Sequence, residues 1–227
     1  MNDSDSSAPK KTRILVLDDH PFFRSGLIHW LNQQPSLTCC GDTGSVAAAR
    51  RAMADLRPDI ILLDLRLGDG HGLDLIREFS ETHPKTRIIA LSQFDENTYA
   101  HRALLAGARG YVMKSEPSET VLAAIQTTLK GEIYVSRRIT AHLIQNLFPD
   151  PAVNAPDLAR LSDRELQVFR LLGLGSNVRA IAKRLKISPK TVETYRGHLK
   201  EKLRLPDGAA LLRAATIWVE HGRLDRR

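Results

Sequence analysis

Several short apolar runs in this chain end in a charged side chain. The runs cover residues 14–17, 60–63 and 110–113, and the charged residues that follow them are Asp18 and Asp19, Asp64, and Lys114. A short, wholly apolar run between helical patterns is typical of a parallel strand covered on both faces by helices. Ligands bind beyond the carboxyl ends of such strands, so we expect these charges to meet at one point. Three carboxylates so close together require a cation, and Mg²⁺, which prefers oxygen ligands, suits them.

An alternating pattern of strands and helices must position these charges. Strands are predicted at residues 13–18, 37–40, 59–64, 86–92 and 109–114, with helical patterns between them. Five such units joined by short links indicate an α/β fold with a five-stranded parallel sheet. The strand order 2-1-3-4-5 is that of flavodoxin-like folds and is adopted by analogy. It places Asp19 and Asp64 side by side.

The composition indicates a cytoplasmic protein of two domains. The chain has 227 residues and is 42% hydrophobic, which is enough for two modest cores. No apolar run approaches the ~18 residues of a membrane helix, and the first residues lack the apolar core of a signal peptide, so no membrane contact is expected. Cys39 and Cys40 are adjacent and are interpreted as reduced strand residues.

Charge is divided unevenly along the chain. Residues 1–156 contain 17 Lys and Arg against 18 Asp and Glu, a net charge of −1, whereas residues 157–227 contain 16 against 8, a net charge of +8. A basic second part indicates a polyanionic partner, most simply nucleic acid. A solvated basic surface is the competing interpretation.

The basic part has the pattern of a helix-turn-helix. Ser162 and Glu165 have capping-box spacing, Lys186 and Ile187 mark a tight turn, and Ser188 precedes Pro189 at the start of a further helix. That helix should turn Val192, Tyr195, Leu199 and Leu203 inward. Lys190, Glu193, Thr194, Arg196, Gly197 and Lys200 should face outward. A plain helical bundle explains less, because basic and hydrogen-bonding residues line one exposed helix.

The acidic residues of the first half, with their partners, resemble the receiver domain of two-component response regulators. The residues that carry the resemblance are Asp18-Asp19-His20, Asp64, Ser92, Tyr111 and Lys114. The resemblance implies that Asp64 is the phosphoacceptor and that Mg²⁺ is held by Asp19, Asp64, the backbone carbonyl of Arg66 and, directly or through water, Asp18. It also implies that Ser92, Tyr111 and Lys114 contact the phosphoryl group or act in the switch. Singly, each residue has a plainer interpretation as a helix cap, turn residue or core residue.

The segment after Asp64 departs from the receiver pattern. The family commonly has a Met-Pro pair there, whereas this chain reads Leu65-Arg66-Leu67-Gly68-Asp69-Gly70. We therefore expect a looser loop, with the carboxylate of Asp69 adding negative charge beside the site.

The second half resembles the LuxR/FixJ-type helix-turn-helix, so that the whole chain has the architecture of the NarL/FixJ response regulators. The matching segments are residues 161–165, 181–185 and 188–195, and Lys186 stands where many relatives have Gly. The resemblance implies DNA-binding residues Lys190, Thr191, Glu193, Thr194, Arg196, Gly197 and Lys200. It also implies dimerisation through the last helix, residues 207–221, by Leu211, Leu212, Ala215 and Trp218. Packing of that helix inside the monomer is an equal alternative.

The predicted organisation has four segments. Residues 1–12 are a disordered N-terminus, residues 13–131 the receiver domain, residues 132–157 a linker with an amphipathic helix, and residues 158–227 the LuxR-type DNA-binding domain. The helix in the linker carries Ile139, Leu143, Ile144 and Leu147 on one stripe. This stripe is assigned to packing on the receiver in preference to a partner site.

These observations together predict a cytoplasmic, two-component response regulator. The two resemblances imply that a histidine kinase phosphorylates Asp64 and that the protein binds double-stranded DNA as a homodimer when phosphorylated. They also imply that it is not an enzyme, apart from autodephosphorylation. One alternative is a DNA-binding regulator that works without phosphorylation. Another is a phosphohydrolase with an aspartyl nucleophile, which fits less well because such enzymes have two acids separated by one residue on the first strand.

Overall fold

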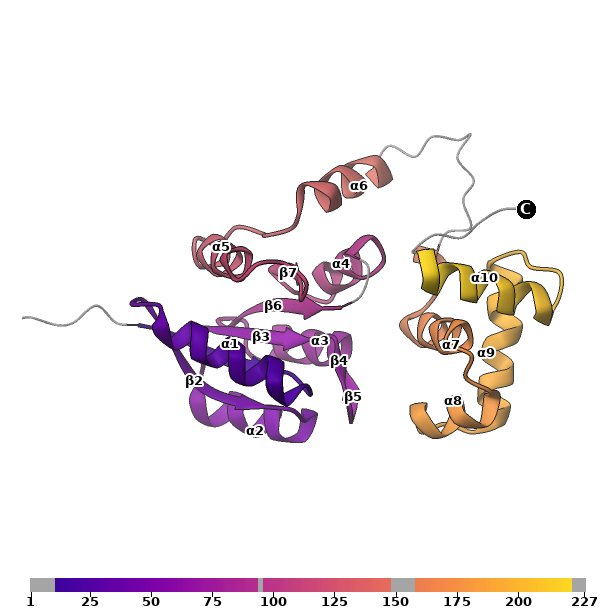
Figure 1. The fold of residues 1–227 in the computed structure, drawn as a ribbon, viewed down its shortest axis with the longest axis horizontal. Helices are drawn as coiled ribbons and strands as arrows, with labels where there is room; N and C mark the ends of the chain where they lie inside the picture. Colours follow the sequence, from indigo (N-terminus) through magenta and orange to yellow (C-terminus); the bar gives the residue numbers. More distant parts are fainter. Residues whose placement is uncertain (1–10, 94–95, 148–157, 222–227) are drawn as a thin grey trace, which may run out of the picture. The chain divides into compact units, whose positions relative to one another are not determined.

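The computed structural model describes residues 11–93, 96–147 and 158–221, which form two compact units (Figure 1). The first unit extends to Leu147 and the second begins at Phe148. The segment predicted to be a disordered N-terminus lies almost wholly outside the described residues. Among the described helices, none has both the length and the apolar character needed to cross a membrane.

A five-stranded parallel sheet forms the centre of the first unit. The strands are β1 (Thr12–Leu17), β2 (Leu37–Thr43), β3 (Ile60–Asp64), β6 (Arg87–Ser92) and β7 (Gly110–Met113). Their spatial order is β2-β1-β3-β6-β7, which confirms the predicted order 2-1-3-4-5. Leu17 pairs with Leu63, and Asp64 pairs with Leu91, so β1, β3 and β6 end at the same edge. This register brings the acidic residues to one point.

The second strand is longer than expected because it continues to Thr43 instead of ending at Cys40. Cys39 and Cys40 lie within it as free, partly buried thiols, as predicted. Burial raises the pKa of both thiols, which keeps them protonated at neutral pH.

Helices cover both faces of the sheet. They are α1 (Pro21–Gln33), α2 (Val46–Leu56), α3 (Gly72–Thr82), α4 (Glu96–Leu105) and α5 (Ser118–Leu129). On one face, Leu27 and Leu31 of α1 and Ile125 of α5 pack with alternate strand residues such as Val16 and Leu62. Burying both faces explains why the strands are continuous apolar runs.

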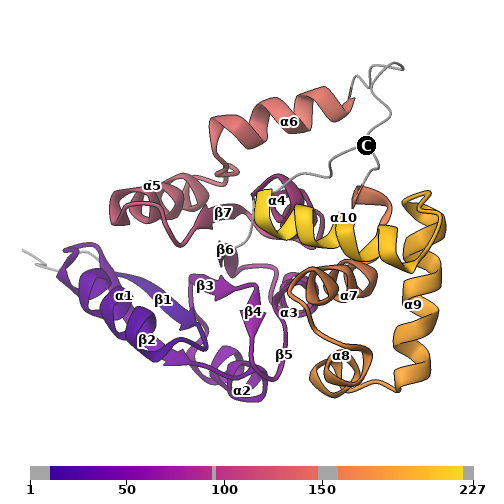
Figure 2. The same cartoon turned by 45° about the vertical axis from the view of Figure 1, so that its right-hand side comes forward.

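A short antiparallel hairpin follows the third strand of the sheet. It consists of β4 (Arg66–Leu67) and β5 (Gly70–His71), and in both views it lies beside α2 (Figures 1 and 2). The Gly-rich sequence after Asp64 predicts a loose loop here. That expectation is wrong, because the two short strands pair and their tip is bonded to α2 through Asp69.

Residues 132–147, assigned to the linker from the sequence, lie in the same compact unit as the sheet. Tyr134 bridges to Gly110 at the edge of β7, and α6 (Arg137–Leu147) packs against α4. Ile139 of α6 is buried, which agrees with packing of its apolar stripe on the receiver. The side chains of Ile144 and Leu147, and residues 148–157 of the linker, are outside the described residues.

The second unit is helical. It contains a short 3₁₀ turn (Leu158–Arg160) and the helices α7 (Asp163–Gly173), α8 (Val178–Leu185), α9 (Pro189–Lys202) and α10 (Gly208–His221). Ser162 and Glu165 form the predicted capping box, and Ser188 caps α9. Lys186 ends α8 with a φ of 54°, a left-handed conformation that costs a non-Gly residue roughly 1 kcal/mol. The predicted helix-turn-helix consists of α8, the turn from Lys186 to Ser188, and α9.

Candidate functional site

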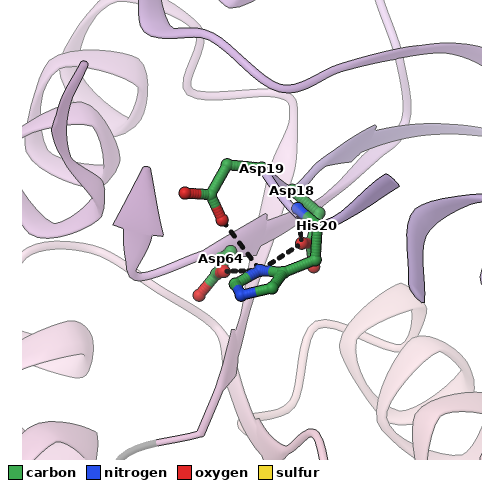
Figure 3. Close-up of side chains that lie close together, drawn as sticks. All are labelled: Asp18, Asp19, His20 and Asp64. Atoms are coloured by element: carbon green, nitrogen blue, oxygen red, sulfur yellow. Dashed lines mark hydrogen bonds and ion pairs between the residues drawn. The ribbon is translucent and has the colours of Figure 1, made fainter. Parts of the chain in front are cut away.

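The acidic residues predicted to converge do so at the carboxyl end of the sheet. Asp18, Asp19, His20 and Asp64 each place one potential ligand atom within 4.8 Å of the others (Figure 3). Asp18 and Asp64 are 0% and 2% exposed, whereas Asp19 and His20 are partly exposed. The pocket is thus buried on the side of β1 and β3 and accessible on the side of Asp19.

Lys114 is the buried cation of this pocket. Its Nζ lies 2.6 Å from Asp18 Oδ2 and 2.7 Å from Asp64 Oδ2, and it sits 4.7 Å from the centre of the Phe23 ring. The backbone N–H of Lys114 donates to the carbonyl of Ser92, which ties the end of β7 to the end of β6. One ammonium therefore serves two buried carboxylates.

The electrostatics of Asp64 show that this compensation is incomplete. Burial raises the pKa of Asp64 above its usual value, and the negative charge of Asp18 adds to the rise. Hydrogen bonds from the Arg66 backbone N–H and from Lys114 lower the pKa of Asp64 but do not outweigh burial. An additional cation beside Asp64 would lower its pKa and favour the carboxylate form.

The donor set fits a hard divalent ion. Asp18 Oδ2 and Asp19 Oδ1 are both buried and accept no hydrogen bond of good geometry, although Lys114 Nζ and His20 Nδ1 lie close to them. Three carboxylates in one pocket, two of them with an oxygen unsatisfied by hydrogen bonds, match the all-oxygen preference of Mg²⁺. The predicted ligands Asp18, Asp19 and Asp64 are thus brought together.

His20 is part of the sequence motif, but the motif alone predicts no role for its side chain. Its Nδ1 lies 2.8 Å from Asp19 Oδ1 and 3.2 Å from Asp18 Oδ1 (Figure 3). Its Nε2 lies 2.6 Å from Nη2 of Arg66. The imidazole therefore occupies the middle of the acidic pocket. The position of His20 directly after two aspartates at the end of a strand was the signal in the sequence that could have placed it in this pocket.

The predicted switch residues Ser92 and Tyr111 are buried, and Arg66, the predicted backbone ligand, is partly exposed. Ser92 is the last residue of β6, one position beyond the partner of Asp64, and Tyr111 lies in β7 three residues before Lys114. The backbone N–H of Arg66 donates to Asp64 Oδ1 at 2.9 Å. Asp69 is not among the residues of the pocket, because its carboxylate is bonded to α2. The expectation that it adds charge beside the site is therefore corrected.

The predicted DNA-binding residues lie along the exposed side of α9. Lys190, Glu193, Thr194 and Gly197 are exposed, while Thr191, Arg196 and Lys200 are partly exposed. Val192, Leu199 and Leu203 are buried as expected, and Tyr195 is only partly buried. Charged side chains therefore line one face of this helix and apolar ones the other.

Three of these side chains, Glu193, Thr194 and Arg196, already have partners on the helix. Arg196 Nη1 lies 2.8 Å from Glu193 Oε1, and Thr194 Oγ1 donates to the Lys190 carbonyl at 3.1 Å. A cavity of about 100 Å³ is lined by Glu193, Arg196, Gly197, Lys200, Gly208 and Leu211. Arg196 is thus directed toward the start of α10.

Further cations on α8 and the turn were missed. Arg179, Lys183, Arg184 and Lys186 are all exposed and precede α9. The first helix of a helix-turn-helix crosses the DNA backbone, so these cations are suited to phosphate contacts. The signal in the sequence was the run Lys183-Arg184-Leu185-Lys186.

The predicted dimer contacts on α10 need correction. Leu211, Ala215 and Trp218 are buried in their own unit, and Trp218 packs on Phe169 with ring centroids 5.5 Å apart. The main chain of α10 also lies against Gly173 of α7, where an added Cβ would come within 2.7 Å of the Ala215 carbonyl carbon. These three side chains therefore belong to the core. Leu212 is 47% exposed and is the one member of the predicted set available to a second chain.

Comparisons with known proteins agree with this organisation. The family model described as "Response regulator receiver domain" matches residues 14–126, and that described as "Bacterial regulatory proteins, luxR family" matches residues 159–215. The oxygen regulatory protein NreC of Staphylococcus aureus is 33% identical over 208 residues, which cover 89% of this chain and 96% of NreC.

Solved structures with similar folds include two regulators. One is a LuxR-family two-component response regulator from Aurantimonas sp. SI85-9A1, with a TM-score of 0.57 and 27% identity over 61% of this chain and 99% of that one. The other is RcsB from Salmonella enterica serovar Typhimurium, with a TM-score of 0.65 and 24% identity over 90% of this chain and 98% of that one.

Proposed function

Because the chain belongs to the LuxR-type two-component response regulators, which control transcription, we propose that phosphorylation of Asp64 switches its binding to DNA. The observation that carries this proposal is the state of Asp64. It is a buried carboxylate with a raised pKa, in contact with Lys114 and next to two further carboxylates. Such an arrangement favours a ligand that brings positive charge to the pocket.

In the proposed reaction an oxygen of Asp64 attacks the phosphorus of a phosphohistidine on a histidine kinase. The new O–P bond forms as the donor's P–N bond breaks, and the imidazole nitrogen of the donor keeps the electron pair and takes a proton from solvent. Lys114 holds one phosphoryl oxygen by its ammonium, and the Ser92 hydroxyl holds another. In this proposal Ser92 moves to make that contact, and Tyr111 changes position in response. Autodephosphorylation is attack by water on the same phosphorus atom, which breaks the bond to Asp64, releases inorganic phosphate and regenerates the carboxylate.

Mg²⁺ is the proposed cofactor. Asp18, Asp19, Asp64 and the backbone carbonyl of Arg66 would hold it, with Asp18 acting directly or through water. When bound, the ion supplies charge neutralisation for the transferring phosphoryl group. The unsatisfied oxygens of Asp18 and Asp19 support this assignment.

The output in this proposal is binding of double-stranded DNA by a homodimer in the bacterial cytoplasm. The side chains proposed for α9 are Lys190, Thr191, Glu193, Thr194, Arg196, Gly197 and Lys200, and α8 adds phosphate contacts. The RcsB structure named above was determined with a promoter and a phosphomimetic. Its fold likeness to this chain makes the same coupling a reasonable expectation here. Leu212 is the proposed contact between the two copies.

Intact-mass measurement after incubation with acetyl phosphate and Mg²⁺ tests the phosphoacceptor. The wild-type protein should gain one phosphoryl group, and Asp64→Asn should gain none while keeping its circular dichroism spectrum. Asp19→Asn should need more Mg²⁺ for the same labelling. Asp74→Asn, an exposed carboxylate on α3, is the matched control and should behave as wild type.

The same assay separates the proposal from one of the alternatives. Full labelling of Asp64→Asn would exclude Asp64 as the acceptor. Absence of labelling in the wild type would favour a regulator that works without phosphorylation. The phosphohydrolase needs a separate phosphate-release assay, in which steady turnover of phosphomonoesters would favour that alternative.

A further inference from the structure

The hairpin after Asp64 is fastened at both ends. At its base, the Gly72 N–H donates to the Leu65 carbonyl at 3.1 Å. An added Cβ at Gly72 would lie 2.5 Å from Leu65 Cα and 2.6 Å from the Asp64 carbonyl oxygen. The two ends of the hairpin therefore meet in direct backbone contact beside Asp64, and only glycine fits there.

At its tip, the hairpin is bonded to the start of α2. The Val46 N–H donates to Asp69 at 2.9 Å for Oδ1 and 3.0 Å for Oδ2. Val46 is the first residue of α2, so this N–H has no partner within the helix, and a carboxylate there also favours the helix dipole. Gly70 allows the contact, because an added Cβ would lie 2.6 Å from Val46 Cγ2.

Between these two attachments lies the residue that contacts the phosphoacceptor. The Arg66 backbone N–H donates to Asp64 Oδ1 at 2.9 Å, and the Arg66 side chain reaches His20 in the acidic pocket. A shift of the hairpin would move both contacts together. The Arg66 carbonyl, the proposed metal ligand, lies on the same peptide segment.

We propose that Asp69 is a positioning residue, whose bond to the start of α2 holds the hairpin so that Arg66 is fixed against Asp64 and the metal. This inference rests on the proposed Mg²⁺ site. In this chain, the Asp69–Val46 bond takes the place of the stiffness that a proline would give the segment after the phosphoacceptor. Asp69 acts through Arg66 and is not itself a ligand.

Calorimetric titration of the full chain with Mg²⁺ tests the proposal. In Asp69→Ala the dissociation constant for Mg²⁺ should rise by about tenfold, the low end of what loss of a supporting contact costs a metal site. Asp69→Asn should bind close to wild type, because its side-chain oxygen can still accept from Val46. Glu78→Ala, which breaks the Arg50–Glu78 ion pair between α2 and α3 but leaves the hairpin, is the matched control and should also bind as wild type.

Hydrogen exchange gives a second measurement that does not depend on metal. The Arg66 amide should exchange faster in Asp69→Ala than in the wild type, Asp69→Asn or Glu78→Ala. Gly70→Ala is a second variant in case Asp69→Ala folds poorly, because its added methyl group presses the hairpin away from Val46. It should show the same weaker Mg²⁺ binding and the same faster exchange of the Arg66 amide.

The outcomes are distinguishable. Wild-type protein that takes up no Mg²⁺ contradicts the proposed metal site itself. Equal affinities in wild type and Asp69→Ala overturn the positioning role and leave the metal site standing. A loss in Asp69→Asn as large as that in Asp69→Ala also overturns it, because it would mean that charge and not the hydrogen bond is what matters.

Discussion

Asp64 of the first unit and Glu165 of the second are buried carboxylates that pair with a lysine, and the two pairs differ in their electrostatics. Asp64 and Glu165 are each 2% exposed, and each has an oxygen 2.7 Å from a lysine Nζ, that of Lys114 and of Lys202 respectively. Burial raises the pKa of Asp64. Burial also opposes ionisation of Glu165, but hydrogen bonds from Lys202 and from Ser162 outweigh it and hold the pKa of Glu165 below its usual value.

The difference lies in what surrounds each pair. Glu165 has its own lysine and accepts two further bonds from Ser162, one from the backbone and one from the hydroxyl. Asp64 shares its lysine with Asp18. A satisfied buried carboxylate stabilises its fold, here by joining α7 to α9, whereas an incompletely compensated one is prepared for a ligand.

The largest expected effect is removal of the shared lysine. Lys114→Ala leaves Asp18 and Asp64 buried without a cation, which should destabilise the first unit by about 3–5 kcal/mol. Urea denaturation measures this, with the exposed Lys130→Ala as control. Added Mg²⁺ should recover more stability in the variant than in wild type. A Lys114→Ala protein of wild-type stability would show that Asp64 does not depend on Lys114 for compensation of its charge.

Removal of the satisfied carboxylate should cost less. Glu165→Ala loses the capping box and the bond to Lys202, about 1–3 kcal/mol of the second unit's stability. Exposed Glu201→Ala on α9 is the control. Thermal unfolding of the second unit at neutral pH gives the comparison, and an unchanged melting temperature would argue against the structural role of Glu165.

The pH dependence of the same unit sharpens this point. The folded pKa of Glu165 lies below the unfolded value near 4.5, so its stabilisation is complete above that value and is lost as the pH falls through the folded pKa. Glu165→Gln should therefore flatten the acid limb of the stability curve. An acid limb in Glu165→Gln identical to that of wild type would mean that other carboxylates cause the loss of stability at low pH.

Substitutions of polar and charged side chains on the exposed side of α9 should affect DNA binding and leave stability nearly unchanged. Lys200→Ala should weaken all DNA sequences alike and lower the salt slope by about one unit. Glu193→Ala or Thr194→Ala should lose about 1–3 kcal/mol of discrimination at particular base pairs. Binding to a library of single-base variants at several salt concentrations separates these effects. Unchanged base preference in both Glu193→Ala and Thr194→Ala would place specificity elsewhere.

The smallest effect on stability is expected at Leu212. Leu212→Glu should change the free energy of unfolding by no more than about 0.5 kcal/mol, because the side chain is on the surface. It should nevertheless abolish cooperative binding to two half-sites. Leu174→Glu is a matched control, since Leu174 is 49% exposed and Leu212 47%. Cooperative binding retained by Leu212→Glu would remove the last predicted dimer contact.

The buried site was predictable because its signals are local. A wholly apolar run shows a buried strand, and the residue after it must lie at the sheet edge, which located Asp18, Asp64 and Lys114 together. The hairpin left no such signal, since its strands have two residues each and the partner of Asp69 lies 23 positions earlier in the chain. A helical stripe likewise shows an apolar face but not what covers it, and so Leu211 could not be assigned between core and interface.

The most direct test of the account is the affinity of the protein for a selected DNA site, measured by fluorescence anisotropy with and without acetyl phosphate and Mg²⁺. The account predicts that the phosphodonor tightens binding by the wild-type protein and leaves binding by Asp64→Asn unchanged. Equal affinities of the wild-type protein in both conditions, with mass measurement showing Asp64 phosphorylated, would contradict it.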